Sequence, residues 1–127
     1  MKFIQLDKAD TFEIACEITM KNTTYFQCKM DEFLMKSTKN MILDMDKVMY
    51  LNNAALGIIA QAALRARQND KELVISGVKS PISEIFDIVK FANFAKLFVT
   101  REEALEYFQM KMCSESLFFS NELILNK

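Results

Sequence analysis

Two short, continuous apolar runs constrain the fold of this chain more than any other feature. Residues 41–43 (Met-Ile-Leu) and 73–75 (Leu-Val-Ile) have the length and composition of strands that are buried on both faces. A helical pattern follows each run, and parallel strands need such crossover helices to connect them. The chain is therefore predicted to form one α/β domain, with a largely parallel or mixed sheet and right-handed crossovers.

Further strands are expected on both sides of these runs. Residues 3–6 indicate a short first strand, and residues 97–99 indicate a short last one. Between residues 12 and 18, apolar and polar side chains alternate with period 2, which is typical of a strand with one solvent-exposed face. The side chains that this pattern turns inward are Phe12, Ile14, Cys16 and Ile18.

Four helices are predicted from their caps and apolar stripes. Asn22-Thr23-Thr24, Ser80-Pro81 and the Thr100 to Glu103 capping box each favour a helix start, and Asn69 favours a left-handed helix end. In the first three helices the stripes expected to face the core are Phe26, Met30, Phe33 and Leu34; Ala55, Ile58, Ile59, Ala62 and Ala66; and Ile82, Ile85, Phe86 and Val89. Ile88 and Phe91 are then expected to point outward.

The side chains that most catalysis depends on are missing or badly spaced. Histidine is absent, and Cys16, Cys28 and Cys113 lack metal-ligand spacing, so we expect reduced, mostly buried thiols. Asp44 and Asp46 could be taken for a metal or acid–base pair, but two carboxylates at this spacing more often form a turn or cap. We therefore expect no enzyme activity, no catalytic residue, no metal site and no cofactor.

Charge and hydropathy limit the partners. The net charge of −1 comes without a basic patch, which argues against direct nucleic-acid binding. No window offers about twenty uncharged apolar residues, so no membrane span is expected and a cytoplasmic location is predicted. Residues 1–112 are assigned to the domain. The apolar residues 113–127 are expected to pack back on it or to form a homodimer with a second copy.

The junction at residues 51–57 (Leu-Asn-Asn-Ala-Ala-Leu-Gly) is the candidate functional segment. A strand-like run ends just before it, and an apolar helix begins within it. Loops at strand ends are exposed while the scaffold beneath them is rigid, so they often carry function. The first turns of this helix are apolar nearly all round, so the helix is either buried on several sides or begins in a docking surface.

An ordered set of segments resembles a known family. Met41-Ile42-Leu43-Asp44-Met45-Asp46-Lys47-Val48, the junction, Leu73-Val74-Ile75-Ser76-Gly77-Val78, Ser80-Pro81 and Glu102-Glu103-Ala104-Leu105 together resemble the STAS domain of bacterial anti-sigma factor antagonists. The resemblance implies a mixed sheet of four to five strands with helices packed mainly on one face. It also implies a partner switch in transcription regulation, in which the antagonist docks onto an anti-sigma factor kinase and frees a sigma factor.

The resemblance assigns Asn53 to the position of the serine that the family phosphorylates. Asn52 then matches the preceding aspartate, and Leu56 and Gly57 match the end of the motif. Asparagine has no hydroxyl, so the usual gain of about 1.5–2 negative charges is impossible at this position. Alternatively, Asn52 and Asn53 serve only as turn and cap residues, which is compatible with an interface.

The resulting hypothesis is a non-enzymatic interaction module without its usual switch. The residues expected to bind a protein partner are Asn52, Asn53, Ala54, Leu56, Ile88 and Phe91. The alternatives are a sensor of nucleotides or lipids and a scaffold subunit of a regulatory or membrane-associated transport complex. Thr23, Thr24, Ser80 and Ser83 are other candidate phosphorylation sites, although each also has a capping explanation.

Overall fold

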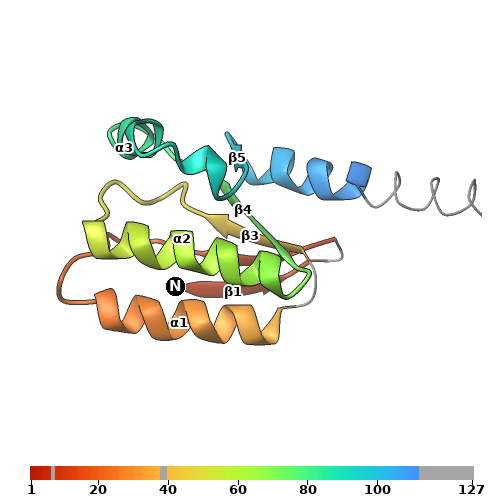
Figure 1. Ribbon diagram of the computed structural model, residues 1–127, viewed down its shortest axis with the longest axis horizontal. Helices are drawn as coiled ribbons and strands as arrows, with labels where there is room; N and C mark the ends of the chain where they lie inside the picture. Colours follow the sequence, from red (N-terminus) through yellow and green to blue (C-terminus); the bar gives the residue numbers. More distant parts are fainter. Residues whose placement is uncertain (7, 38–39, 112–127) are drawn as a thin grey trace, which may run out of the picture.

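A single five-stranded sheet forms the centre of the protein (Figure 1). The structure is a computed structural model that describes residues 1–6, 8–37 and 40–111. The strands lie in chain order and are β1 (Lys2–Gln5), β2 (Asp10–Glu13), β3 (Asn40–Asp44), β4 (Glu72–Ser76) and β5 (Leu97–Phe98). β1 is antiparallel to β2 and the other neighbours are parallel, so the predicted mixed sheet is confirmed.

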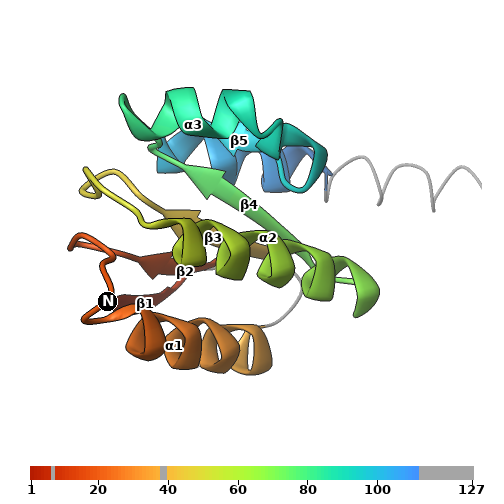
Figure 2. The ribbon, with the colours of Figure 1, turned by 60° about the vertical axis from the view of Figure 1, so that its left-hand side comes forward.

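Helices cover both faces of this sheet, most of them on one face (Figures 1 and 2). The labelled helices are α1 (Thr23–Lys36), α2 (Asn53–Gln68), α3 (Ile82–Ile88) and the 3₁₀ turn η1 (Phe91–Asn93). Their buried side chains share one core cluster with the sheet. The C-terminal helix, described over residues 101–111, packs on the opposite face. The expected distribution of helices is therefore confirmed.

Side-chain alternation along β3 and β4 explains why these runs are continuously apolar. Met41 and Leu43 belong to the cluster beneath α1, α2 and α3, whereas Ile42 belongs to a second cluster under the C-terminal helix. Successive side chains of a strand point to opposite faces, so a strand covered on both sides is apolar at every position. The second cluster consists of Ala9, Ile42, Val74, Ala104 and Phe108.

The apolar stripes of the first two helices are buried as predicted. All four stripe residues of α1 and all five of α2 lie in the core. In the first of these, Phe33 packs on Phe12 with 5.4 Å between ring centroids. In α3 only Ile82 and Phe86 are buried, while Ile85 and Val89 are partly exposed. This helix has only seven residues, which is too few for its fourth stripe position.

The expected burial of the cysteines was wrong for both described thiols, which are free but exposed. β2 ends at Glu13, so the period-2 pattern continues through a loop in which Ile14 and Ile18 are buried but Cys16 is exposed. Cys28 is exposed on α1. Cys113 and the predicted extension 113–127 lie outside the described residues.

Two helix boundaries differ from the prediction by one residue. The left-handed residue after α2 is Asp70, with φ of 58°, whereas Asn69 has φ of −106° and donates its side-chain amide to the Arg65 carbonyl. α3 starts at Ile82 with Pro81 as its N-cap, not Ser80. Gly77 closes β4 with φ of +77°, as expected for glycine at the end of this strand.

Candidate functional site

Asn52 holds the start of α2 and joins it to α1. Its Oδ1 accepts a hydrogen bond of 2.8 Å from the Ala55 N–H, which makes it the N-cap residue. Its Nδ2 donates to Thr23 Oγ1 at 2.9 Å, and Thr23 is the first residue of α1. One amide side chain therefore fixes two helix N-termini relative to each other.

The backbone of the junction is paired with the loop that precedes α1. The Asn52 N–H donates to the Ile18 carbonyl at 3.0 Å, and the Ile18 N–H donates to the Tyr50 carbonyl at 3.1 Å. Ile18 and Leu51 are both buried, so these hydrogen bonds connect the junction to the core. The sequence correctly indicates a rigid support beneath this loop.

Asn53 and Ala54 are exposed in the first turn of α2, and Leu56 is half-buried beside them. Free N–H groups at a helix start give this end a partial positive charge, and residues 53–56 carry no acidic side chain to offset it. The turn thus offers neutral polar and apolar contacts in a positive local field.

Exposed apolar side chains immediately precede the junction. Met49 is 56% exposed and Tyr50 is 49% exposed, while their neighbours Val48 and Leu51 are buried. The sequence suggested a strand that continued through these four residues, but they form a loop after β3. The apolar run at residues 48–51 could have indicated the exposed pair. It has four residues, and only Val48 and Leu51 are buried in the core.

Ile88 and Phe91, the two predicted surface residues beyond the junction, have opposite environments. Ile88 is 80% exposed, with Ile85 and Val89 also partly exposed near it. Phe91 is buried and stacks on Phe86 with 4.5 Å between ring centroids, so its expected exposure was wrong. The reason is that α3 ends at Ile88 and Lys90 takes a left-handed conformation, which turns Phe91 back into the core.

The acidic pair after β3 forms a turn, as expected. Asp44 Oδ1 accepts a hydrogen bond of 3.0 Å from the Asp46 N–H, and Arg101 Nη1 lies 3.7 Å from Asp44 Oδ2. Burial raises the pKa of Asp44, against the lowering effects of the Asp46 N–H and Arg101. Over residues 1–6, 8–37 and 40–111, no group of three His, Cys, Asp or Glu side chains is arranged to hold a metal ion.

The other hydroxyl candidates have local roles or local partners. Thr23 donates to the Thr19 carbonyl and accepts from Asn52, so its hydroxyl acts as both donor and acceptor within the fold. Ser80 Oγ lies 3.3 Å from Glu84 Oε1. Thr24 is exposed and Ser83 is half-buried, each in the first turn of a helix. Phosphorylation of any of them stays a prediction.

No helix among the described residues has the length and apolarity needed to cross a membrane.

Comparisons with known proteins agree with this architecture. BtrV of Bordetella bronchiseptica, a proposed anti-sigma factor antagonist, is 26% identical over 109 residues, which cover 84% of this chain and 94% of BtrV. An anti-sigma factor antagonist from Mycobacterium paratuberculosis has the same fold, with a TM-score of 0.78 at 14% identity over 85% of this chain and 92% of its own.

The same fold occurs in a transporter. The STAS domain of a SulP transporter from Vibrio cholerae matches with a TM-score of 0.66 at 11% identity, over 87% of this chain and 88% of its own. The sequence model of the STAS domain matches residues 4–104, which is most of the chain. The protein therefore belongs to the STAS domain family.

Proposed function

We propose that this protein is a non-enzymatic anti-sigma factor antagonist that docks onto an anti-sigma factor of the serine kinase type. The observation that carries the proposal is the exposed, uncharged first turn of α2, at Asn53 and Ala54, held rigidly by Asn52. The similarity to BtrV, itself a proposed antagonist, supports the same class of partner. The module would act in the cytoplasm, in transcription regulation.

The docking surface consists of Met49, Tyr50, Asn53, Ala54, Leu56 and Ile88. Its members are exposed or half-buried, and all except Asn53 have largely apolar side chains. Interfaces of this kind combine apolar anchors with a few polar contacts. Asn52 contributes as a positioning residue, because the oxygen and the nitrogen of its side-chain amide are both hydrogen-bonded within the protein.

Asn53 makes the docking surface permanently competent. A phosphate at this position would add about 1.5–2 negative charges to the first turn of α2 and block a partner that fits the neutral surface. The side chain of Asn53 has no hydroxyl to accept a phosphoryl group. Release of the partner would then depend on the abundance of the two proteins or on a signal received elsewhere in the chain.

The test uses Asn53→Asp and an anti-sigma factor kinase from the same cell, with affinity measured by calorimetry. The negative charge should weaken binding by roughly tenfold or more, equivalent to about 1.4 kcal/mol. An aspartate in the first turn favours the helix, so the variant should not lose stability. Gln61→Glu, which adds the same charge at an exposed position further along α2, is the matched control. Equal affinities for the two variants would contradict the docking surface.

A scaffold subunit of a membrane-associated transport complex is the second candidate. The observation that favours it is the fold shared with the Vibrio cholerae SulP transporter domain. Affinity purification of the tagged protein from its own cells separates the candidates. Co-purification with a transporter and without an anti-sigma factor would replace the first proposal with the second.

A further inference from the structure

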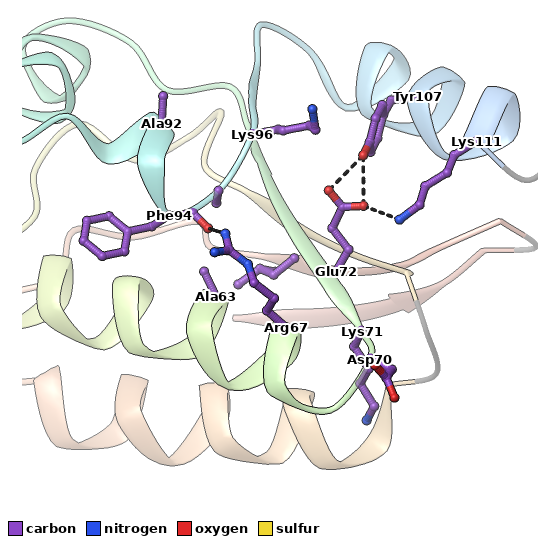
Figure 3. Close-up of a pocket in the computed structure, with 12 residues that line it drawn as sticks. Ala63, Arg67, Asp70, Lys71, Glu72, Ala92, Phe94, Lys96, Tyr107 and Lys111 are labelled. Carbon is purple, nitrogen blue, oxygen red and sulfur yellow. Dashed lines mark hydrogen bonds and ion pairs between the residues drawn. The ribbon is translucent and has the colours of Figure 1, made fainter.

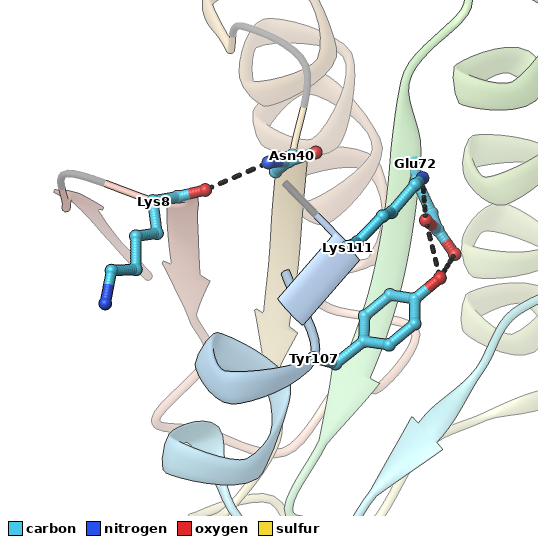
Figure 4. Close-up of polar contacts among 5 residues, drawn as sticks. All are labelled: Lys8, Asn40, Glu72, Tyr107 and Lys111. Carbon is cyan, nitrogen blue, oxygen red and sulfur yellow. Dashed lines mark hydrogen bonds and ion pairs between the residues drawn. The ribbon is translucent and has the colours of Figure 1, made fainter. Parts of the chain in front are cut away.

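The two edges of the sheet differ in how they are protected. At one edge, β5 pairs only with Ile75 and Ser76, and η1 and the C-terminal helix flank the open first part of β4 (Figure 3). Glu72 of β4 holds this helix in place, because it accepts hydrogen bonds of 2.9 Å from the Tyr107 hydroxyl and 2.6 Å from Lys111 Nζ (Figure 4). At the other edge, within the described part of the chain, β1 pairs with β2 alone. An exposed edge strand of this kind is a template for pairing with another strand.

The hairpin of β1 and β2 shows which backbone groups of β1 point to the open edge. The Leu6 N–H donates to the Ala9 carbonyl at 3.2 Å, at the end of the hairpin. Bonded and non-bonded pairs alternate along an antiparallel ladder, so Ile4 also bonds to β2. Phe3 and Gln5 therefore direct their N–H and C=O groups outward. Two copies of this edge can bond to each other in the antiparallel sense.

α1 lies along the same edge of the sheet (Figures 1 and 2). The ring of Phe33 lies 5.5 Å from that of Phe3 in β1 and 5.4 Å from that of Phe12 in β2, so the helix covers these two strands. Neighbouring strands lie about 4.8 Å apart, so two sheets joined at β1 would bring their α1 helices to roughly 10 Å. Helices pack at about 8–10 Å, so a second copy would extend the sheet and the helix layer together.

The side of α1 that faces this edge matches itself about a two-fold axis. Lys29 Nζ lies 5.7 Å from the centre of the Phe3 ring and 5.6 Å from that of Tyr25, so these groups share the β1 side of the helix. Glu32 pairs with Lys29 at 3.3 Å and with Lys36 at 2.6 Å. An axis between residues 29 and 32 of two antiparallel helices places Lys29 opposite Glu32 of the second copy. It also places Tyr25 opposite Lys36, where a cation–π contact can form.

A cavity of about 290 Å³ provides room for one side chain of the second copy. It lies between the β1–β2 hairpin and the last turn of α1, and its lining includes Phe3, Phe33 and Lys36. Tyr25 is 54% exposed, although it is a large aromatic residue. The two-fold arrangement places Tyr25 of the second copy next to Lys36, at this cavity. An aromatic ring there buries a large area and leaves its hydroxyl at the polar rim.

We propose that the protein forms a two-fold homodimer through an edge surface that consists of β1 with Tyr25, Lys29, Glu32 and Lys36 of α1. Phe3 pairs with Phe3 of the second copy, and the two sheets become one continuous sheet. The contact of Lys29 with the Phe3 ring places both at the same level, so one axis serves the strands and the helices. The edge surface shares no residue with the docking surface. The dimer and the protein partner are therefore independent proposals, and either can fail alone.

Sedimentation velocity of the full chain tests the dimer. The wild type should be dimeric at about 100 μM, and Tyr25→Ala and Glu32→Lys should each raise the dimer Kd at least about tenfold. The exchange Lys29→Glu/Glu32→Lys should restore the dimer, because opposite charges face each other again. Met35→Ala, at a position that is 81% exposed on the α2 side of the same helix, is the matched control and should leave the Kd unchanged. Circular dichroism establishes that each variant is folded.

Three outcomes of this experiment would overturn the proposal. The first is a wild type that stays monomeric at about 100 μM. The second is a dimer that persists unchanged in Tyr25→Ala and Glu32→Lys. The third is an exchange variant that dimerises no better than Glu32→Lys, because the two-fold pairing of Lys29 with Glu32 requires the rescue.

Amide hydrogen exchange of the wild type locates the contact without any variant. The Phe3 and Gln5 amides become hydrogen-bonded in the dimer, so their exchange should slow as the protein concentration rises. The Ile4 amide bonds to β2 in both states and is the internal reference. A dimer in which Phe3 and Gln5 exchange equally fast at every concentration would form through another surface, such as residues 113–127, and would overturn the proposal.

Discussion

Asn52 shows how a single side chain can define the geometry of the docking surface. It caps α2 through its oxygen and reaches α1 through its nitrogen, so it uses both functions of an amide. An aspartate could supply the first contact, but an ionised carboxylate has no hydrogen to donate to Thr23. The choice of asparagine is therefore explained by the contacts of residue 52 within the fold.

Asn52→Ala should lower the free energy of unfolding by about 1–2 kcal/mol, because the cap and the contact with Thr23 are both lost. Asn52→Asp should fall between the wild type and the alanine variant, since it keeps only the acceptor. Urea denaturation monitored by circular dichroism measures the difference. Asn53→Ala is the control and should change stability by no more than about 0.5 kcal/mol. Equal effects of the two alanine substitutions would exclude this role for Asn52.

The raised pKa of Asp44 predicts that this residue makes the fold less stable as the pH rises. Burial raises its pKa above the ordinary value of 3.8, so the folded protein binds this proton more tightly than the unfolded chain does. Stability from this group is present below pH 3.8 and is lost as the pH rises through the raised folded value. Asp44→Asn, which keeps an oxygen for the Asp46 N–H, should melt at a higher temperature than the wild type at pH 7.

Melting curves between about pH 3 and pH 7 check this expectation. The advantage of Asp44→Asn should shrink as the pH falls from the raised folded pKa towards 3.8, and it should be smallest below 3.8, where the wild-type carboxyl is neutral in both the folded and the unfolded state. Asp46→Asn is the control, because the Asp46 side chain is 60% exposed and its removal relieves no burial. If Asp44→Asn were less stable than the wild type at pH 7, the attraction between Asp44 and Arg101 would outweigh the cost of burying the charged carboxylate.

At the scale of elements, the change from α3 to η1 leaves Ile88 on the surface and places Phe91, only three positions later, in the core. Both Ile88 and Phe91 fall outside the apolar stripe of an uninterrupted helix, which is why the sequence suggested the same exposure for both. A change of chain direction at Lys90 gives them different environments. That change is not encoded by a glycine or proline, so periodicity alone could not reveal it.

Phe91→Ala should destabilise the fold by about 3–5 kcal/mol, because it removes a buried ring stacked on Phe86. Ile88→Ala should leave stability within about 0.5 kcal/mol but weaken partner binding by about 1–2 kcal/mol if Ile88 is an anchor. Chemical denaturation and calorimetric binding measure the two effects. If Phe91→Ala lost partner binding without losing stability, Phe91 would belong to the docking surface and not to the core.

The regular elements were predictable because their patterns depend on local physics. The buried strands follow from continuous apolar runs, and α1 and α2 follow from stripes at helical spacing. Cys16 was misplaced because the period-2 pattern of the sequence continues past the end of β2 into a loop whose residues 15–17 are exposed. The opening beside the first part of β4 was not predictable, since it depends on where β5 begins to pair.

At the scale of the whole molecule, stability depends on two cores separated by one sheet. The C-terminal helix supplies Ala104 and Phe108 to the smaller core, over Ile42 and Val74. Besides Ala9, the residues in the smaller core come from the two central apolar runs and from the helix over residues 101–111. Loss of this helix would expose a complete face of the sheet.

Phe108→Ala should therefore cost about 3–5 kcal/mol, as for any fully buried phenylalanine. Met110→Ala, at a position that is 70% exposed on the same helix, is the matched control and should be nearly neutral. Urea denaturation compares the two variants. A Phe108→Ala variant as stable as Met110→Ala would show that the second face contributes little to folding.

The order of the strands has a consequence for the way the protein is made. Each strand lies beside the one synthesised just before it, so no strand must insert between two that are already paired. The sheet can grow strand by strand at one edge while the chain emerges from the ribosome, with short loop closures at each step. Among the described residues, the helix over residues 101–111 covers the second face, so that apolar face stays exposed until this helix has been translated.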